Sequence, residues 1–151
     1  MQFGYKVAAI GRGSENPALA KKLGATVYVD NKVTNAAEAL QKLRDAQVIL
    51  ATAPSSKAMS EVIDGLAPNG KLMVVGATMD PIEVTPVQLI TGSRSIQGWA
   101  SGTPADAEDT LRFAELTGVR PMIETYQLEK AAEAYQRMMS GNAQFRVVLT
   151  M

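Results

Sequence analysis

The sequence contains neither cysteine nor histidine among its 151 residues. It therefore has no disulfide, no thiol nucleophile and no imidazole base, and it lacks the two residue types that zinc prefers as ligands. No apolar run approaches the roughly 18 residues of a membrane span, and the N-terminal segment lacks the apolar stretch and cleavage site of a secretion signal. We therefore expect a cytoplasmic protein, without a membrane partner and without a metal site of its own.

The sequence also lacks an excess of either charge, because 15 lysines and arginines balance 15 acidic residues. The basic residues are scattered rather than gathered in a stripe, so we expect no nucleic-acid partner. Hydrophobic residues make up 46% of the chain, which is typical of a globular domain with a core. No Gly-x-Gly-x-x-Gly is present, the turn that cradles a pyrophosphate at a helix N-terminus in many dinucleotide-binding folds.

What the sequence does contain is an alternation of short apolar runs with helical patterns. The apolar runs predict strands at residues 6–10, 26–30, 46–53, 71–77 and 95–100. Apolar stripes and capping residues predict helices at 15–23, at 36–43 after Thr34 or Asn35, after Ser55 or Ser56, at 86–90, and from Thr103 to Gly118. Strands that alternate with helices indicate βαβ units and a parallel sheet.

The tail of the chain departs from this alternation. Residues 122–128 lead into a helix whose apolar stripe runs from Leu128 to Met139, and residues 145–150 form a final strand. A soft boundary lies between Gly118 and Pro121. Pro68, Asn69 and Gly70 predict a turn before the strand at 71–77.

Small residues follow four of the predicted strands, where an open parallel sheet binds its ligands. Glycines in such places can simply form turns, but four successive small strand ends favour a nucleotide cleft, because a flat ligand can approach the backbone there. The four segments are Gly11-Arg12-Gly13, Thr52-Ala53-Pro54, Gly76-Ala77-Thr78 and Gly98-Trp99-Ala100.

The first of these segments bears on the choice of cofactor. Dinucleotide-binding folds usually place an acidic residue there to hold the ribose hydroxyls, but this chain has Gly11 followed by Arg12. A missing carboxylate leaves room for a 2′-phosphate, which a guanidinium pairs through two parallel hydrogen bonds. The segment therefore predicts a preference for NADP, with an exposed loop arginine as the alternative.

No catalytic constellation is predicted. Ser55, Ser56 and Ser101 have no histidine base. Glu108 and Asp109 fall early in a predicted helix, where acidic side chains favour the helix dipole.

In this order and spacing the segments resemble the medium-chain, zinc-type alcohol dehydrogenases. Residues 6–30, with Ala-Lys-Lys-Leu-Gly-Ala at 20–25, resemble the family's second strand, helix and third strand. Residues 48–77, 95–114 and 126–151 resemble its fourth to fifth strands, its sixth strand with the next helix, and its C-terminal helix and closing strand. The resemblance implies an α/β fold, a Rossmann-like doubly wound parallel sheet lacking its first strand. It divides the chain into an incomplete dinucleotide-binding domain, 1–120, and a helix and strand returning to the catalytic domain, 121–151.

The resemblance also implies a function and a set of cofactor contacts. The family transfers a hydride between NAD or NADP and an alcohol or aldehyde, here expected to be a primary one, with the help of a catalytic zinc. The implied cofactor-binding residues are Gly11, Arg12 and Gly13 at the adenosine ribose; Thr52 and Ala53 on the adenosine side; Val75, Gly76 and Ala77 beside the nicotinamide ribose; Gly98, Trp99 and Ala100 at the carboxamide; and Arg146 at the pyrophosphate.

Two parts of the family pattern are missing, the zinc-bearing domain and the first strand of the cofactor domain. We therefore expect a truncated product or an internal start at Met1, inactive alone, with zinc only in the full-length enzyme. The empty place between the second and fourth strands should be closed by those strands or filled by another segment. A different class of function is a non-catalytic nucleotide-binding or dimerisation module, a homodimer through Ser95–Ala100. A third reading, an unrelated α/β fold such as a methyltransferase, fits the tail poorly.

Overall fold

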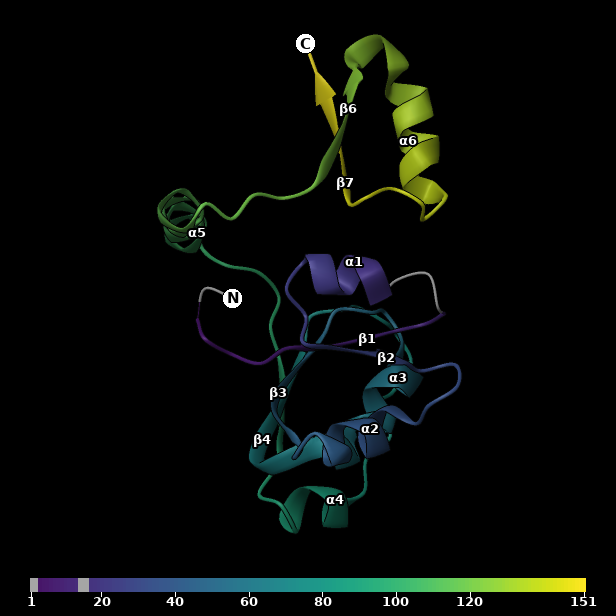
Figure 1. Cartoon of the computed structure of the whole chain (residues 1–151), viewed down its shortest axis with the longest axis vertical. Helices are drawn as coiled ribbons and strands as arrows, with labels where there is room; N and C mark the ends of the chain where they lie inside the picture. The colour runs from purple at the N-terminus through teal and green to yellow at the C-terminus, as the bar shows by residue number, and fades with distance from the viewer. Residues whose placement is uncertain (1–2, 14–16) are drawn as a thin grey trace. The chain divides into compact units, whose positions relative to one another are not determined.

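The computed structural model describes residues 3–13 and 17–151, which form two compact units, Met1–Ser101 and Gly102–Met151 (Figure 1). The end of the first predicted turn, Ser14, and the start of the first predicted helix, at 15–16, lie outside the described residues. Within those residues the order of strands and helices is the predicted one.

The first unit contains two parallel sheets. One pairs β1 (Ala8–Gly11) with β2 (Val27–Asp30), and the other has the order β3 (Ala46–Ala51), β4 (Leu66–Val74), β5 (Ser95–Gly98). The helices between the strands are α1 (Pro17–Lys22), α2 (Ala36–Lys42), α3 (Ser56–Glu61) and α4 (Pro86–Ile90), with a 3-10 turn, η1 (Ile63–Gly65), before β4. Parallel strands joined by helices confirm the predicted α/β class.

The separation of the two sheets marks the place of the missing strand. Among the described residues β1 pairs only with β2, and β3 only with β4. The sequence led us to expect that these strands would close on each other or that another segment would fill the place, and the described part of the chain shows neither. The two edges stay unpaired, although Ile10 of β1 and Ile49 of β3 pack against the same hydrophobic core.

The helix starts follow the predicted capping chemistry. The Asn35 side chain, rather than Thr34, accepts the backbone N–H of Glu38 at 3.1 Å, and Ser55, rather than Ser56, accepts that of Ala58 at 3.3 Å. Each cap satisfies one of the N–H groups that have no partner within the first turn of a helix.

The predicted turn at Pro68–Gly70 lies inside a strand. β4 already begins at Leu66, and its register with β3 jumps from Ala46 opposite Leu66 to Val48 opposite Lys71. Asn69 adopts a positive φ of 59°, and its N–H donates to the Gly92 carbonyl at 2.7 Å. The residues therefore bulge out of the ladder and rejoin it, since the chain on both sides of the bulge is paired with β3.

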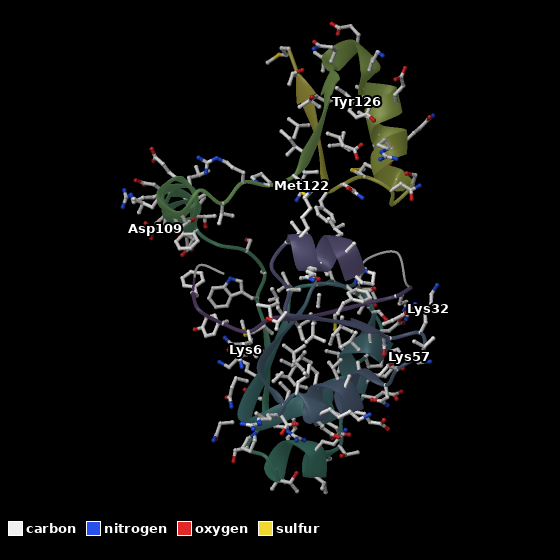
Figure 2. All side chains as sticks on the ribbon, viewed as in Figure 1. Lys6, Lys32, Lys57, Asp109, Met122 and Tyr126 are labelled. Carbon is white, nitrogen blue, oxygen red and sulfur yellow. The ribbon has the colours of Figure 1, made fainter. Side chains whose placement is uncertain are left out.

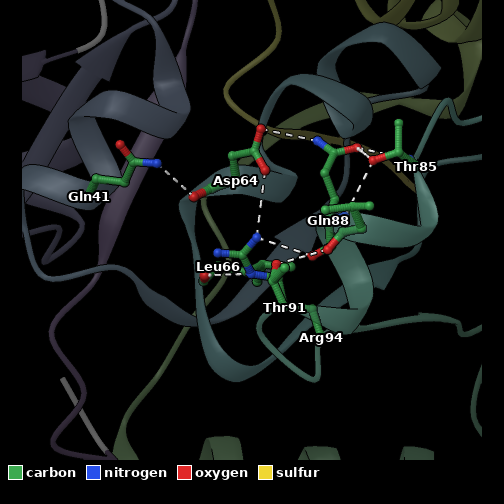
Figure 3. A network of polar contacts seen from close by, with 8 residues as sticks. Gln41, Asp64, Leu66, Thr85, Gln88, Thr91 and Arg94 are labelled. Carbon is green, nitrogen blue, oxygen red and sulfur yellow. Dashed lines mark hydrogen bonds and ion pairs between the residues drawn. The ribbon is translucent and has the colours of Figure 1, made fainter.

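The core of the first unit lies between the β3–β4–β5 sheet and the segment from α3 to η1. Met59, Ile63, Leu66 and Leu72 are its largest fully buried side chains. Arg94 ties the start of β4 to α4: its Nε donates to the Leu66 carbonyl at 2.9 Å and its Nη1 to the Gln88 carbonyl at 3.2 Å (Figure 3).

The second unit begins with α5 (Pro104–Thr117), which Thr103 caps and the left-handed Gly118 (φ 69°) ends. β6 (Ile123–Gln127) then pairs in parallel with β7 (Arg146–Thr150), and η2 (Leu128–Lys130) and α6 (Ala131–Met139) connect them. Figure 1 shows α6 lying beside this strand pair. The division into domains 1–120 and 121–151 stays a prediction.

Candidate functional site

The ends of β3, β4 and β5 meet at one edge of their sheet, because all three strands run in the same direction. The N–H groups of Val75 and Gly76 both donate to the Ala51 carbonyl, at 3.0 and 2.9 Å, and the Trp99 N–H donates to the Val74 carbonyl at 2.9 Å. The structure thus brings together three of the four predicted segments, those at residues 52–54, 76–78 and 98–100.

Gly76 lies directly against the backbone of the neighbouring strand end. A Cβ built on it would lie 2.5 Å from the Ala53 carbonyl oxygen and 2.8 Å from that of Thr52. Both distances are far inside van der Waals contact, and the obstructing atoms are backbone rather than flexible side chain. Only glycine fits here, so at this point the edge of the sheet is bare backbone.

The rest of this edge is open. Thr52, Ala53, Ala77 and Ala100 are exposed, and a Cβ built on Gly98 would meet no atom within 4 Å. Trp99 is 55% exposed, so its ring offers a large flat apolar face beside the small strand ends. Such an arrangement suits the planar rings and sugars of a nucleotide better than a small spherical ligand.

The remaining predicted segment, Gly11–Gly13, begins at the last residue of β1, in the other sheet of the unit. Gly11 lies opposite Asp30 in the register, and its carbonyl accepts the Asn31 N–H at 2.8 Å. Arg12 is exposed, as both the cofactor-binding hypothesis and the loop-arginine alternative require.

Sequence reasoning missed two side chains that hold this segment. The Tyr28 hydroxyl donates to the Gly13 carbonyl, and Asp30 Oδ1 accepts the Gly13 N–H, both at 2.9 Å. A second N–H, from Lys32, also donates to Asp30 Oδ1; the two backbone donors, led by that of Lys32, lower the pKa of Asp30 below its usual value. The spacing in the sequence could have indicated them, because Tyr28 and Asp30 are two residues apart in a strand and project from the same face.

Arg146, the last predicted contact, lies in the second unit. It is the first residue of β7, opposite Ile123, and it is exposed. Its contact with a pyrophosphate stays a prediction.

The residues of this chain do not fit a zinc ion. The sequence has no cysteine or histidine, and within residues 3–13 and 17–151 no three acidic side chains gather where they could hold a metal. Zinc prefers sulfur and imidazole nitrogen ligands, so no step of a reaction can be assigned to a metal held by these residues.

None of the helices in the described part of the chain is long and apolar enough to span a membrane.

Comparison of the sequence with known proteins identifies the family of this chain. Residues 1–116 match the zinc-binding dehydrogenases. The chain belongs to this family. It is 40% identical over 150 residues to the alcohol dehydrogenase patD of Penicillium expansum and 38% identical to the alcohol dehydrogenase notN of an Aspergillus species.

The family members that this chain matches are much longer. The match covers 99% of this chain but 44% of patD and of notN, so the chain spans less than half the length of these relatives. The fold also matches an alcohol dehydrogenase from Escherichia coli solved with NADH, with a TM-score of 0.82 at 20% identity, over 97% of this chain and 44% of that one. This chain therefore shares its fold with part of that dehydrogenase.

Proposed function

We propose that this chain is part of an NAD(P)-dependent alcohol dehydrogenase or aldehyde reductase, which transfers a hydride between the nicotinamide cofactor and a primary alcohol or aldehyde. The observation that carries the proposal is the contact of Gly76 with the backbone of Thr52 and Ala53, which leaves the edge of the sheet free of side chains at that point. In the whole enzyme residues 1–120 would belong to the cofactor domain and residues 121–151 would return to the catalytic domain.

The cofactor would lie along the small strand ends. Thr52 and Ala53 would line its adenosine side, Val75, Gly76 and Ala77 would lie beside the nicotinamide ribose, Gly98, Trp99 and Ala100 would meet the carboxamide, and Arg146 the pyrophosphate. The dehydrogenase from Escherichia coli with this fold was solved with NADH, which supports a nicotinamide cofactor. Among the two forms of the cofactor we propose NADP, because Gly11 brings no carboxylate to the ribose and Arg12 is an exposed cation.

The proposed chemistry divides between this chain and the rest of the enzyme. The nicotinamide accepts or gives the hydride when it is bound. The residues of this chain would bind and orient the cofactor, whereas a zinc ion would require ligands from the remainder of the full-length enzyme. We therefore expect the pure 151-residue chain to show no turnover of benzyl or cinnamyl alcohol, and measurable turnover would refute this division.

A titration of the chain with NADPH tests cofactor binding. Trp99 is the only tryptophan, and its exposed ring lies at the proposed site, so we expect its emission to change and to saturate. No change up to millimolar NADPH would count against both binding and the placement of Trp99. Arg12→Ala should weaken NADPH binding about tenfold or more and leave NADH binding unchanged, since a charge-assisted bidentate contact is lost.

A second candidate function is a dimerisation module without catalysis. In the described part of the chain β5 pairs only with β4, so its outer edge is open, and an open edge can pair with a second copy of the same strand. Ser95–Ala100 would then form the interface. Static light scattering over a range of concentrations tests this idea, and a monomer at the highest concentration would contradict it.

A further inference from the structure

The turn that carries Arg12 is held by side chains of the neighbouring strand. Gly13 has one backbone donor and one backbone acceptor, and both are bound by residues of β2: its N–H by Asp30 Oδ1 and its carbonyl by the Tyr28 hydroxyl, each at 2.9 Å. Turns usually bond to themselves or to water, and here two strand side chains fix the path of the backbone immediately after Arg12.

Steric contacts restrict the same turn. A Cβ built on Gly11 would lie 2.7 Å from the Tyr28 hydroxyl oxygen and 3.2 Å from the ring, so the ring packs against the glycine before Arg12. Gly13 has a φ of +92°, a conformation that side-chain-bearing residues rarely adopt. Tyr28 therefore contacts the turn on both sides of Arg12, by packing at Gly11 and by its hydrogen bond at Gly13.

The charges around the turn favour an anion in spite of Asp30. Oδ1 of this carboxylate is occupied by two backbone N–H donors, from Gly13 and Lys32, each at 2.9 Å. The Lys32 ammonium is 3.7 Å from the position that a Cβ of Gly13 would take. Lys32, labelled in Figure 2, and Arg12 are both exposed. Two accessible cations, Arg12 and Lys32, thus lie at the turn, and the Asp30 carboxylate beside them is already hydrogen-bonded.

We propose that Tyr28 and Asp30 are positioning residues that hold the Gly11–Gly13 turn so that Arg12 and Lys32 together receive the 2′-phosphate of an adenosine ribose. Cofactor preference is then a property of β2 and of Lys32, two residues after its end, as well as of the turn itself. This inference rests on the proposed preference for NADP, and it adds a second cation and two holding side chains to it.

Isothermal titration of the whole 151-residue chain tests the proposal with two probes, adenosine 2′,5′-bisphosphate and adenosine 5′-monophosphate. The two probes differ by the 2′-phosphate, so the ratio of their dissociation constants isolates that group. Tyr28→Phe removes the hydroxyl and keeps the ring. We expect it to weaken binding of the bisphosphate by about three- to tenfold and to leave the monophosphate unchanged, as the loss of one hydrogen bond that orients the site predicts.

Lys32→Ala should lower the affinity for the bisphosphate by a similar factor, again without an effect on the monophosphate. Asp30→Ala should reduce the preference for the bisphosphate over the monophosphate, because the Gly13 N–H loses its acceptor. If the Asp30 carboxylate merely repelled the phosphate, the same substitution would increase that preference. Tyr135→Phe, on an exposed side chain of α6, and Lys42→Ala, on the exposed end of α2, serve as matched controls that should change neither affinity.

The outcomes separate the two proposals. If the unaltered chain binds neither probe at millimolar concentration, or shows no preference for the bisphosphate, the proposed NADP site fails and this inference fails with it. If Arg12→Ala abolishes a clear preference while Tyr28→Phe and Lys32→Ala retain it, the NADP site stands and the role of β2 is overturned. Equal weakening of both probes by Tyr28→Phe would show a merely structural role and would also overturn it.

Discussion

Replacing Gly76 with alanine gives the sharpest test of the proposed sheet edge. The new Cβ would lie 2.5 Å from the Ala53 carbonyl oxygen, and ordinary contact begins at 3.4 Å, so the two strand ends must separate by about 0.9 Å. The obstructing atoms belong to the backbone of β3's extension, which is held to β4 by hydrogen bonds from Val75 and Gly76. The strain therefore cannot be relieved by a side-chain rotation alone.

Two effects of opposite sign set the change in the free energy of unfolding that Gly76→Ala causes. Overpacking of this kind costs about 1–3 kcal/mol. Alanine also restricts the unfolded chain more than glycine does, which returns about 0.4–1 kcal/mol where the native backbone is compatible. Gly76 does not have a positive φ, so the second effect applies. We expect a net loss of about 1–2 kcal/mol in the free energy of unfolding, together with weaker NADPH binding.

Gly98→Ala is the matched control, because its Cβ would meet no atom within 4 Å and its φ is not positive either. It should leave stability unchanged or raise it slightly. Urea denaturation, followed by the emission of Trp99, measures both variants, and the difference between them isolates the steric clash. Equal stabilities of the two variants would refute the close contact at Gly76 and, with it, the argument for a bare sheet edge.

Three further predictions concern stability. Arg94→Ala should cost about 1.5–3 kcal/mol, because it leaves the carbonyl of the buried Leu66 without its charged donor. Leu72→Ala, at a fully buried position, should cost about 2–5 kcal/mol. The hydrogen bonds of Glu124 to Arg137 and to a backbone N–H lower its pKa from 4.5 to about 2. The second unit should therefore keep this stabilisation above about pH 4.5 and lose it as the pH falls towards about 2.

Two of these predictions have a control of the same residue type, and the third is tested by replacing the carboxylate itself. Arg112→Ala is the control for Arg94→Ala, because Arg112 forms an exposed ion pair with Glu108 on α5. Leu111→Ala is the control for Leu72→Ala, because Leu111 is 72% exposed. Each should change the free energy of unfolding by less than about 0.5 kcal/mol. Glu124→Gln should remove the acid-dependent loss in the second unit, which hydrogen exchange at β6 and β7 measures across the acid range. A loss of protection with the same pH profile in Glu124→Gln would contradict the assignment to this carboxylate.

The sequence predicted the parallel strands and the order of the elements because those depend on local patterns. A short β-branched run or a capping residue acts over a few residues. The structure accordingly has a strand at Val27–Asp30 and a helix that Asn35 caps, as predicted. The same locality predicted a turn at Pro68–Gly70 before the strand at 71–77, whereas pairing with β3 on both sides makes these residues part of β4.

The sequence by itself also determined the chemistry that this chain lacks, since an absent cysteine or histidine is absent in any fold. Tertiary structure alone decided that Gly76 packs against the backbone of Thr52 and Ala53. It also decided that Tyr28 and Asp30 form hydrogen bonds with the backbone of Gly13. Those contacts join residues of different strands, and their distances depend on register and twist, which a local pattern does not specify.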